Sequence, residues 1–445
     1  MKNRNRLSEF IIITLIVVCG FISCNTTEPP DPPPPPPPPV YKDTITVTVE
    51  DVTHRSITVN IKTTVNNPNS TIKLFRIINS NEAQVSEYPI TVNDTCIIDD
   101  NSGSGLQLNT TYTYYAVRID TTGIRKDSSN IAEARTQDTT SQNFSFEFFE
   151  FGDGVSSSYF NDVWIFNEND IWVCGNVFTN DSTDGNLYHW NGSYWNAHRL
   201  NFVDMEGIWG IDTIMYLASG GLWKYDRVNL IRQNIEGTFS QGQAVHKLWG
   251  SSESNIYGVG PWGTIVWYNG VQWTKIEFDT QWSFFGITGN KETGLAYAVA
   301  MNTNFSCLIV ELNNSLPNII YNSDNYINKL KSYDVDMIRK DVLILSDSDI
   351  WTFNIKTQTD EILADLPSGY YLPRLTSSGS NDVYFFGNKL QDGERMLHYN
   401  GVRVTTFDLP SRGYVIYGGA CSVNNLAAMA AFSDNKAYII KIRRE

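Results

Sequence analysis

Short segments of alternating apolar and polar residues, separated by polar turns, run through most of the chain. The segments 44–50 and 56–62 both alternate with period two, which is the pattern of a strand with one buried face. The sequence also contains 31 Gly, many Asn and Asp residues, and no long run of Ala, Leu, Glu and Lys. Together with 13% aromatic residues, which favour strands, this pattern predicts an all-β protein.

Three of these segments share one hairpin pattern, an apolar or aromatic strand followed by Asn-Gly and a second strand. The copies lie at 187–195, 265–273 and 397–405. Asn-Gly between apolar runs predicts a type I′ turn, because both central residues of that turn have positive φ. A hairpin that recurs so widely indicates a repeat architecture.

The repeat becomes clear when the chain is aligned on a strand that follows a polar turn in each unit. Seven units result, with a spacing of about 42 residues, which is the length of one four-stranded propeller blade. The aligned residues are Trp172, Tyr216, Tyr257, Tyr297, Leu343, Tyr384 and Ala427. We therefore predict a seven-bladed β-propeller over residues 143–445.

The ends of this region indicate how the ring closes. The last unit has three predicted strands, at 416–420, 426–432 and 437–442, and an unassigned strand at 143–151 precedes the first unit. We expect 143–151 to supply the outermost strand of the last blade, because closure removes the exposed pairing edge of an open ring.

The repeats resemble a degenerate set of bacterial propeller repeats with Asp-Ile-Trp and Trp-Asn-Gly-x-x-Trp patterns, close to the sialidase-type and Ycf48-like repeats. In the first unit these patterns read Asp170-Ile-Trp and Trp190-Asn-Gly-Ser-Tyr-Trp, whereas the fourth and fifth units lack the Asn-Gly hairpin. The sialidase Asp-box, Ser-x-Asp-x-Gly-x-Thr-Trp, is absent from all seven units. The resemblance therefore transfers no catalytic residue to this chain.

A separate domain is predicted at 42–137. Tyr112 follows Leu106 by six residues and opens a strand, which resembles the fibronectin type III signature. The resemblance implies a β-sandwich in which the Tyr112 hydroxyl bonds the backbone upstream, with Asn109 in a left-handed turn. Such domains are usually spacers or adhesion modules, and no Arg-Gly-Asp loop is present.

The amino-terminal residues resemble the leader of a bacterial lipoprotein. Basic residues are followed by an apolar stretch, 10–18, that is too short to span a bilayer comfortably. Phe21-Ile-Ser-Cys24 resembles a lipobox, with Phe21 in place of the usual Leu. We expect 1–23 to be a signal peptide and Cys24 to carry the lipid, because several acyl chains give stable anchoring. The alternative is an ordinary secretory signal with an incidental Cys.

Residues 24–41 contain eight consecutive prolines at 32–39. Proline runs form stiff polyproline II spacers, so we expect a stalk between the membrane and the folded domains. The alternative is a ligand for a proline-recognising domain. These features predict a lipid-anchored protein of the cell envelope, located at the outer membrane or the cell surface.

The net charge of −15 and a pI near 4.8 argue against a nucleic-acid partner, because phosphate neutralisation requires clustered Lys and Arg. They also disfavour binding to anionic membrane surfaces. No phosphate loop, dinucleotide fingerprint or Gly-x-Ser-x-Gly elbow is present, so we expect no cofactor.

Candidate metal ligands are weak. The five His residues include no His-Glu-x-x-His, and His189 and His398 occupy matching third-strand positions, which indicates packing or repeat ancestry. The Asp-rich turns at 180–185 and 346–349 favour solvated loops over calcium sites. We expect no metal site.

Cys19 lies in the predicted signal peptide, and Cys24 is the predicted lipid site. The others are Cys96, Cys174, Cys307 and Cys421. No Cys-x-x-Cys is present, so we expect free buried thiols. A Cys174–Cys421 bridge is the alternative, because the first and last blades are neighbours.

Aromatic residues divide into two groups. Those at repeat-equivalent positions are predicted to form the core between blades, and they are Trp164, Trp172, Trp209, Trp249 and Tyr257. Trp262 and Trp282 lie instead on loops that break the repeat, where a Trp ring can stack on sugars or anchor a peptide, so they are the candidate ligand-binding residues.

The sequence thus favours an envelope lipoprotein whose propeller is a non-catalytic platform for a protein or carbohydrate ligand, with no catalytic residue. A propeller glycosidase or polysaccharide lyase is one alternative, and a structural component of an envelope assembly is another. Paired carboxylates at one mouth of the axial channel would favour the enzyme.

Overall fold

The computed structural model describes residues 44–64, 69–91, 93–180, 184–200, 204–278, 280–314, 316–323, 330–410 and 415–445. The predicted signal peptide (1–23), the lipid-attachment residue Cys24 and the proline-rich stalk (24–41) lie outside the described residues. Regular structure in the described part consists of strands, which confirms the all-β prediction. It includes no helix with the length and hydrophobicity needed to span a bilayer.

The first eight strands form two sheets. One sheet has the order β1-β2-β5, and the other has the order β4-β3-β6, with β7 and β8 both pairing with β6. The strands are β1 (Thr44–Val52), β2 (Ile57–Thr64), β3 (Thr71–Ile78), β4 (Asn81–Pro89), β5 (Asp94–Asp99), β6 (Thr111–Ile119), β7 (Arg125–Ser128) and β8 (Ala132–Arg135). Alternate residues of β1, β2, β3 and β6 point into a shared apolar core, as their period-two pattern requires.

Seven sheets follow, each built on four antiparallel strands, which lie in chain order in all but the last sheet. The first sheet contains β10 (Tyr159–Asn167), β11 (Asp170–Val177), β12 (Gly185–Trp190) and β13 (Trp195–His198). The second contains β14 (Gly207–Ile211), β15 (Ile214–Ala218), β16 (Leu222–Tyr225) and β17 (Leu230–Gln233). The third contains β19 (Lys247–Ser252), β20 (Asn255–Gly260), β21 (Thr264–Tyr268) and β22 (Trp273–Lys275), and the short β18 (Ile235–Glu236) pairs in parallel with β22. The next three contain β23 (Ser283–Gly289), β24 (Ala296–Met301), β25 (Cys307–Leu312) and β26 (Asn318–Asn322); β27 (Asp334–Arg339), β28 (Val342–Ser346), β29 (Ile350–Asn354) and β30 (Thr359–Ala364); and β31 (Tyr370–Gly379), β32 (Asp382–Lys389), β33 (Gly393–Tyr399) and β34 (Val404–Asp408). The seventh contains β35 (Ile416–Val423), β36 (Leu426–Ser433), β37 (Lys436–Arg444) and β9 (Phe144–Phe151).

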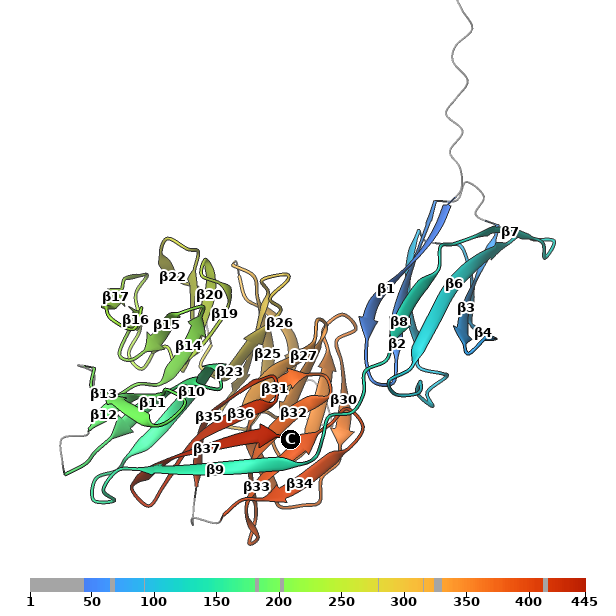
Figure 1. The fold of residues 1–445 in the computed structure, drawn as a ribbon. Coiled ribbons are helices and arrows are strands. Elements are labelled where there is room, and N and C mark those ends of the chain that lie inside the picture. The colour runs from blue at the N-terminus through green and yellow to red at the C-terminus, as the bar shows by residue number, and fades with distance from the viewer. Residues whose placement is uncertain are drawn as a thin grey trace, which may run out of the picture. The chain divides into compact units, whose positions relative to one another are not determined.

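The seven sheets are arranged in a ring. The first strand of each sheet contacts the first strand of the next, in the order β10, β14, β19, β23, β27, β31 and β35, and β35 in turn contacts β10. This radial arrangement of four-stranded sheets is that of a β-propeller, with the first strands at the axis (Figure 1).

The last sheet combines strands from distant parts of the chain. β9 pairs with β37 in antiparallel register over its full length, from Phe151 opposite Ala437 to Phe144 opposite Arg444. In Figure 1 the teal β9 lies alongside the red β37. The chain segment before the first sheet therefore supplies the outermost strand of the last one.

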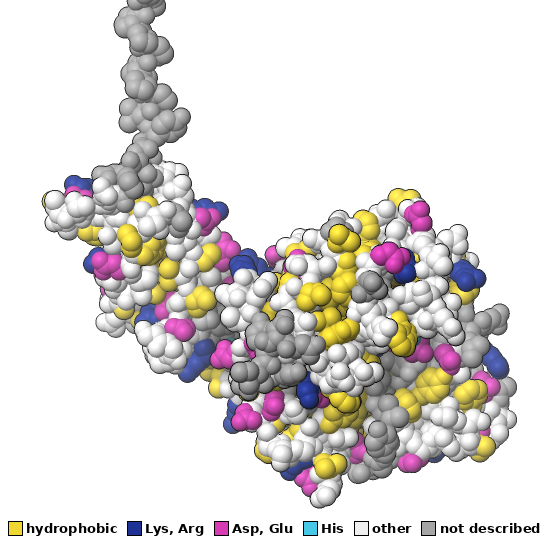
Figure 2. All heavy atoms as spheres, turned by 180° about the vertical axis from the view of Figure 1, so that it is seen from behind, with side chains coloured by type: hydrophobic (Ala, Val, Ile, Leu, Met, Phe, Trp, Pro, Cys, Tyr) yellow, Lys and Arg dark blue, Asp and Glu magenta, His cyan; other side chains and the backbone are white. Residues whose placement is uncertain are grey.

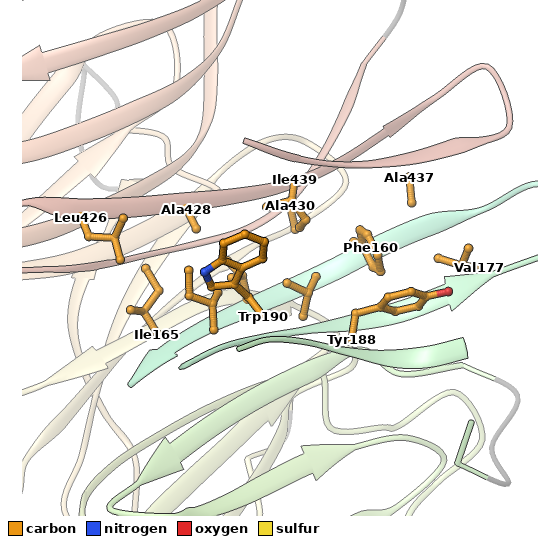
Figure 3. Close-up of a cluster of buried hydrophobic side chains, with 13 residues drawn as sticks. Phe160, Ile165, Val177, Tyr188, Trp190, Leu426, Ala428, Ala430, Ala437 and Ile439 are labelled. Atoms are coloured by element: carbon orange, nitrogen blue, oxygen red, sulfur yellow. The ribbon is translucent and has the colours of Figure 1, made fainter. Parts of the chain in front are cut away.

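The first and last sheets share one apolar cluster. Phe160, Ile165 and Trp190 from the first sheet pack against Leu426 and Ile439 of the last (Figure 3). Phe149 and Phe151 of β9 lie against the same cluster. The ring is thus joined by packing between the sheets as well as by strand pairing.

Large aromatic residues near the axis fit against glycines of the following sheet. A Cβ atom on Gly250 would lie 2.8 Å from the Trp209 ring, and one on Gly289 would lie 2.5 Å from the Trp249 ring. Trp209 and Trp249 are buried, as are Trp172 and Tyr257. These repeat-equivalent aromatics form the core between sheets.

The Asn-Gly turns differ from the predicted type I′ geometry. In the pairs at 191–192, 269–270 and 400–401 the Gly has positive φ and the Asn does not. The third-sheet loop contains four residues, because Tyr268 pairs with Trp273. The Asn269 side-chain oxygen accepts the N–H groups of Val271 and Gln272, at 2.9 and 3.0 Å. The type I′ prediction is wrong because this side-chain acceptor stabilises a longer loop.

The second sheet has the same turn without an Asn-Gly pair. The Asp226 side-chain oxygen accepts the N–H groups of Val228 and Asn229, and Arg227 takes the Gly position with a φ of 74°. The Arg227 guanidinium lies over the rings of Phe166 and Trp172. Contacts of this side chain offset the cost of its left-handed backbone.

The four cysteines in the described part of the chain are free thiols. Cys174 and Cys307 are buried, Cys421 is partly buried, and Cys174 and Cys421 form no disulfide. Cys96 is exposed on β5, so the prediction of a buried thiol is wrong there. The short alternation of β5 gave no indication of which face of the strand is open to solvent.

Candidate axial cavity and ligand-facing loops

The ring encloses a cavity of about 710 Å³ around its axis, lined by residues from the first strands of all seven sheets. Its lining begins at a polar layer that includes Asp162, Lys247 and Asp334, and extends to turns that include Asp212 and Lys291. A volume of this size is typical of ligand sites, which makes the axial cavity the first candidate functional site.

Asp162 connects three sheets at this polar layer. Its Oδ1 accepts the N–H of Val163 at 3.1 Å and lies 3.1 Å from Lys247 Nζ, and its Oδ2 accepts the N–H of Ile208 at 3.3 Å. A Cβ atom at Gly419 of the last sheet would collide with the same Oδ1. The Asp162 carboxylate thus has room only because the preceding sheet has a glycine at this place, and it accepts a hydrogen bond from the following sheet.

Asp334 repeats this arrangement in the fifth sheet. Its Oδ1 accepts the N–H of Val335 at 3.0 Å, and its Oδ2 accepts the N–H of Leu375, in the next sheet, at 3.2 Å. A Cβ atom at Gly286, in the preceding sheet, would lie 2.6 Å from Oδ1. Burial raises the pKa of Asp334 to about 6, although the positive charge of Arg374 opposes the shift.

Asp336 forms a second connection two residues further along β27. Oδ1 accepts the N–H of Met337 at 2.7 Å and the Thr288 hydroxyl at 2.9 Å, and Oδ2 accepts the N–H and hydroxyl of Ser377, at 2.7 and 2.9 Å. Burial raises the pKa of Asp336, and these donors oppose the shift. All four bonds come from neutral groups on three adjacent sheets.

The chemistry of the cavity follows from these contacts. The carboxylates of Asp162, Asp334 and Asp336 each accept a hydrogen bond from their own strand and at least one from a neighbouring sheet, so their first role is to hold the ring together. The channel is therefore polar rather than filled by apolar side chains. Among the described residues, no cluster of His, Cys, Asp and Glu has the arrangement of a metal site.

His189 and His398 lie in equivalent places outside the cavity. His189 Nε2 is 2.8 Å from Asp170 Oδ1, and His398 Nε2 is 2.8 Å from Asp382 Oδ1. The His189 ring also stacks on Trp172, with centroids 4.1 Å apart. In the third sheet the same third-strand position holds a Trp, and its indole N–H donates to Asn255 at 2.8 Å. A buried polar pair is thus a repeated packing feature of the sheets.

The connections between strands define two faces of the ring. The turn between β20 and β21 is bonded to the crossover from the third sheet to the fourth, because the Gly263 N–H donates to the Trp282 carbonyl at 2.8 Å. The turn between β28 and β29 is bonded likewise to the start of β31, where the Leu372 N–H donates to the Asp347 carbonyl. Crossovers between sheets and turns between second and third strands thus share one side, which we name the crossover face.

The remaining turns lie on the opposite side. They join the first strand to the second and the third to the fourth, and the Ile355 N–H donates to the Asp341 carbonyl between two such turns at 2.9 Å. Because this side carries the Asn-Gly turns, we name it the Asn-Gly face.

The two predicted ligand-binding residues lie close together on the crossover face. Trp262 is 50% exposed, with a φ of 55°, and its carbonyl accepts the side-chain N–H of Gln243 at 2.9 Å. Trp282 is partly buried against the apolar cluster between the third and fourth sheets. The structure brings the two loops together and leaves the Trp262 ring more open to a partner.

The described residues that connect strands on the crossover face are strongly acidic. Ten are acidic: Asp153, Asp184, Asp204, Glu206, Glu277, Asp347, Asp349, Asp365, Asp392 and Asp434. Two are basic: Arg199 and Lys331.

The described turns of the Asn-Gly face are nearly balanced in charge. Six residues are acidic: Glu168, Asp212, Asp226, Glu253, Glu292 and Asp341. Five are basic: Arg227, Lys291, Lys340, Lys356 and Arg403. Among the described loop residues, the excess of acidic over basic groups therefore lies on the crossover face.

The sequence did not identify the axial carboxylates. Their signal is an Asp followed by Val on the first strand of a unit, at Asp162-Val and Asp334-Val. A charged residue in an alternating strand resembles a solvent-facing position, and only the ring geometry turns these positions toward the axis.

Comparisons with known proteins support the fold. No protein-family model matches the sequence, and no curated protein matches it. Ycf48 bound to a D1 peptide is similar in structure, with a TM-score of 0.50 and 10% identity, and the match covers 69% of this chain and 97% of that one. Ycf48 from Cyanidioschyzon merolae has a TM-score of 0.48 and 9% identity, over 66% and 98% of the two chains. The Cps50 (Swd1) propeller domain from Myceliophteria thermophila has a TM-score of 0.44 and 13% identity, over 64% and 98%. The match to Ycf48 at a TM-score of 0.50, together with the ring of sheets, confirms the predicted β-propeller fold.

Proposed function

We propose that this chain is a lipid-anchored protein of the cell envelope that presents its propeller as a non-catalytic binding platform. The lipobox-like Phe21-Ile-Ser-Cys24 and the proline run at 32–39 support a lipid on Cys24 and a stalk. The ligand is a protein or a glycan, and the location is the outer membrane or the cell surface.

The observation that supports a binding function rather than catalysis is that the axial carboxylates are already engaged in hydrogen bonds within the ring. A general acid or base must reach its substrate with an available oxygen, whereas both carboxylate oxygens of Asp162, Asp334 and Asp336 already accept hydrogen bonds, some from their own strand and some from neighbouring sheets. Trp262, which is 50% exposed, instead lies on a loop. Such loops on a rigid scaffold are the usual place for ligand contacts.

A protein ligand has additional support from the fold. Ycf48, whose propeller is similar in structure, is bound to a D1 peptide. The same rigid ring offers loop surfaces on both faces in this chain.

The proposed domain order is a signal peptide at 1–23, a lipidated stalk at 24–41, a fibronectin type III-like spacer at 42–137 and a seven-bladed propeller at 143–445. The Gln107 N–H donates to the Tyr112 hydroxyl at 2.8 Å, and Asn109 has a φ of 51°. Both features support the fibronectin type III-like assignment, since the family places a Tyr hydroxyl on upstream backbone at this corner.

Binding is tested by probing glycan arrays and arrays of synthetic peptides with the purified protein. Specific binding that falls at least tenfold in Trp262→Ala, and not in the control Val271→Ala on the opposite face, would support the proposal. Val271 is a suitable control because it is 85% exposed in a turn of the Asn-Gly face. Absence of binding to every glycan and peptide would contradict it.

A propeller glycosidase or lyase is the second candidate, and one observation favours it. The pKa of Asp334, raised to about 6 by burial, approaches the range of a general acid near neutral pH. Turnover of a bound glycan that is abolished by Asp334→Asn, with binding retained, would replace the non-catalytic function.

The anchor is tested by fractionation of cells that express the chain or Cys24→Ala. The unaltered chain is expected in the membrane fraction and extractable by detergent, and Cys24→Ala in the soluble fraction. Equal partitioning of the two proteins would exclude lipidation at Cys24.

A further inference from the structure

The two faces of the ring differ in charge far more than the repeat requires. Connections on the crossover face contain ten acidic and two basic described residues, against six and five on the Asn-Gly face. Because both faces are built from the same seven units, this difference is a property of the individual loops.

Two acidic residues of the crossover face also lie in the same turn. Asp347 and Asp349 share the turn between β28 and β29. Burial raises the pKa of Asp347, and the negative charge of Asp349 adds to the shift, while Lys331 opposes it. A cationic group that binds above this turn would be attracted by both carboxylates.

Aromatic surface adjoins these carboxylates. Tyr333 and Tyr371 meet edge to face beside the turn, with ring centroids 5.6 Å apart, and Tyr371 is 39% exposed. Around the ring, Trp262 is 50% exposed and Phe305 is 55% exposed, both in turns between second and third strands. Aromatic faces attract Lys and Arg side chains and cover apolar ones.

Figure 2 shows that exposed hydrophobic side chains (yellow) form several small, separate groups on the side in view. On this side, apolar side chains alone do not define one docking site, so the charge of the loops bears on which partner fits.

We infer that the crossover face is a docking surface for a protein segment rich in Lys and Arg, with apolar residues that contact the exposed aromatic loops. This inference rests on the proposed binding function and specifies its ligand. Acidic segments and anionic glycans are excluded from this face by charge.

The test compares two variants that lose the same number of charges. The first carries Asp347→Asn, Asp349→Asn and Asp365→Asn on the crossover face. The matched control carries Asp212→Asn, Glu253→Gln and Glu292→Gln on the Asn-Gly face. The probes are a fluorescent 15-residue peptide of Lys, Arg, Leu and Trp, and the same peptide with Glu in place of every Lys and Arg.

The purified protein is expected to bind the cationic peptide, with an affinity that falls as salt is raised. The crossover-face variant should bind it about tenfold more weakly, and the control within about twofold of the unaltered protein. Trp262→Ala should weaken binding further, whereas Val271→Ala should not.

Three outcomes would overturn the inference: equal losses in both charge variants, binding of the acidic peptide, or no binding of the cationic peptide. Binding of a neutral peptide or a glycan in that last case would leave the proposed binding function standing. Absence of binding to every probe would contradict both the inferred ligand and the proposed binding function.

Discussion

At the scale of single residues, the ring depends on charged groups that most strands place in solvent. Asp162 and Lys247 lie in the axial cavity with side chains 11% and 18% exposed, and their charged atoms are 3.1 Å apart. Removing one partner of a largely buried pair leaves the other without compensation. Removal of one partner should therefore cost more than removal of one partner of a surface salt bridge.

Asp162→Ala should lower the free energy of unfolding by about 3 kcal/mol, because Lys247 then lacks its partner and the Ile208 N–H lacks its acceptor. Urea denaturation measures the change. Adding Lys247→Ala to Asp162→Ala should cost less than Lys247→Ala alone. Additive costs of the two substitutions would show that the pair is not coupled.

Asp334 makes folding stability depend on pH with a sign opposite to that of an ordinary ion-paired Asp. Its pKa rises from 3.8 to about 6 on folding, so between these values the folded state binds more protons than the unfolded state. Its contribution to stability is therefore largest below about pH 4 and is lost as the pH rises through about 6.

Asp334→Asn should remove this dependence. The stability of the unaltered protein relative to Asp334→Asn should increase by up to about 3 kcal/mol between pH 7 and pH 4, as measured by denaturation at each pH. Asp212→Asn, in an Asn-Gly face turn, serves as the control with no such change expected. A difference that is constant with pH would contradict the raised pKa.

Residue-level prediction from sequence succeeded where the repeat itself supplied the evidence. Trp209 and Trp249 recur at matching positions of first strands, Trp172 and Tyr257 recur at matching positions of second strands, and all four are buried. Asp162 and Asp334 were missed because each looks like the polar half of an alternating strand. Their inward orientation is a consequence of seven strands meeting at one axis, which no local pattern encodes.

At the scale of the element, the hairpin turns show how a side chain replaces a backbone bond. Asn269 accepts two N–H groups, and Gly270 adopts a φ of 89°. In the second sheet Asp226 is the side-chain acceptor and Arg227 is the residue with positive φ. The shared requirement is an acceptor at the first position and a left-handed residue at the second, so sequence identity at the pair is not needed.

Asn269→Ala should reduce stability by about 1 kcal/mol, because the N–H groups of Val271 and Gln272 lose their acceptor. Val271→Ala, at an 85% exposed position, should leave stability unchanged. Thermal unfolding of both variants measures the difference. Equal stability of Asn269→Ala and the unaltered protein would assign the turn to backbone geometry alone.

At the scale of the whole molecule, the seven sheets close through β9. Phe144, Phe146 and Phe148 pack against the cluster between the sixth and seventh sheets, and Phe149 and Phe151 against the cluster between the seventh and first. The strand thus supplies apolar contacts on both of its faces. The seven-unit spacing predicted this ring from sequence, since it depends on the count of units and not on the identity of any loop.

A chain that begins at residue 152 should fail to unfold cooperatively and should aggregate, because the last sheet would lose its outer strand and both clusters their Phe side chains. A chain that begins at residue 143 is the control and should unfold in one transition. Calorimetry and size-exclusion chromatography measure both. Matching unfolding of the two chains would show that β9 is dispensable.

The position of β9 also determines how the molecule bears mechanical load. Everything that precedes the propeller joins it through this strand, and β37 is the strand that holds β9 in its sheet. Tension applied from the amino-terminal side is therefore resisted first by hydrogen bonds between residues 137–142 and the sixth sheet, such as those of Thr140 with Asn381 and of Gln142 with His398, and then by the β9–β37 ladder. The pairing of β9 with β37, which runs unbroken over eight residues, is thus the part of the ring closure that bears force, and its strength limits the tension at which the propeller opens.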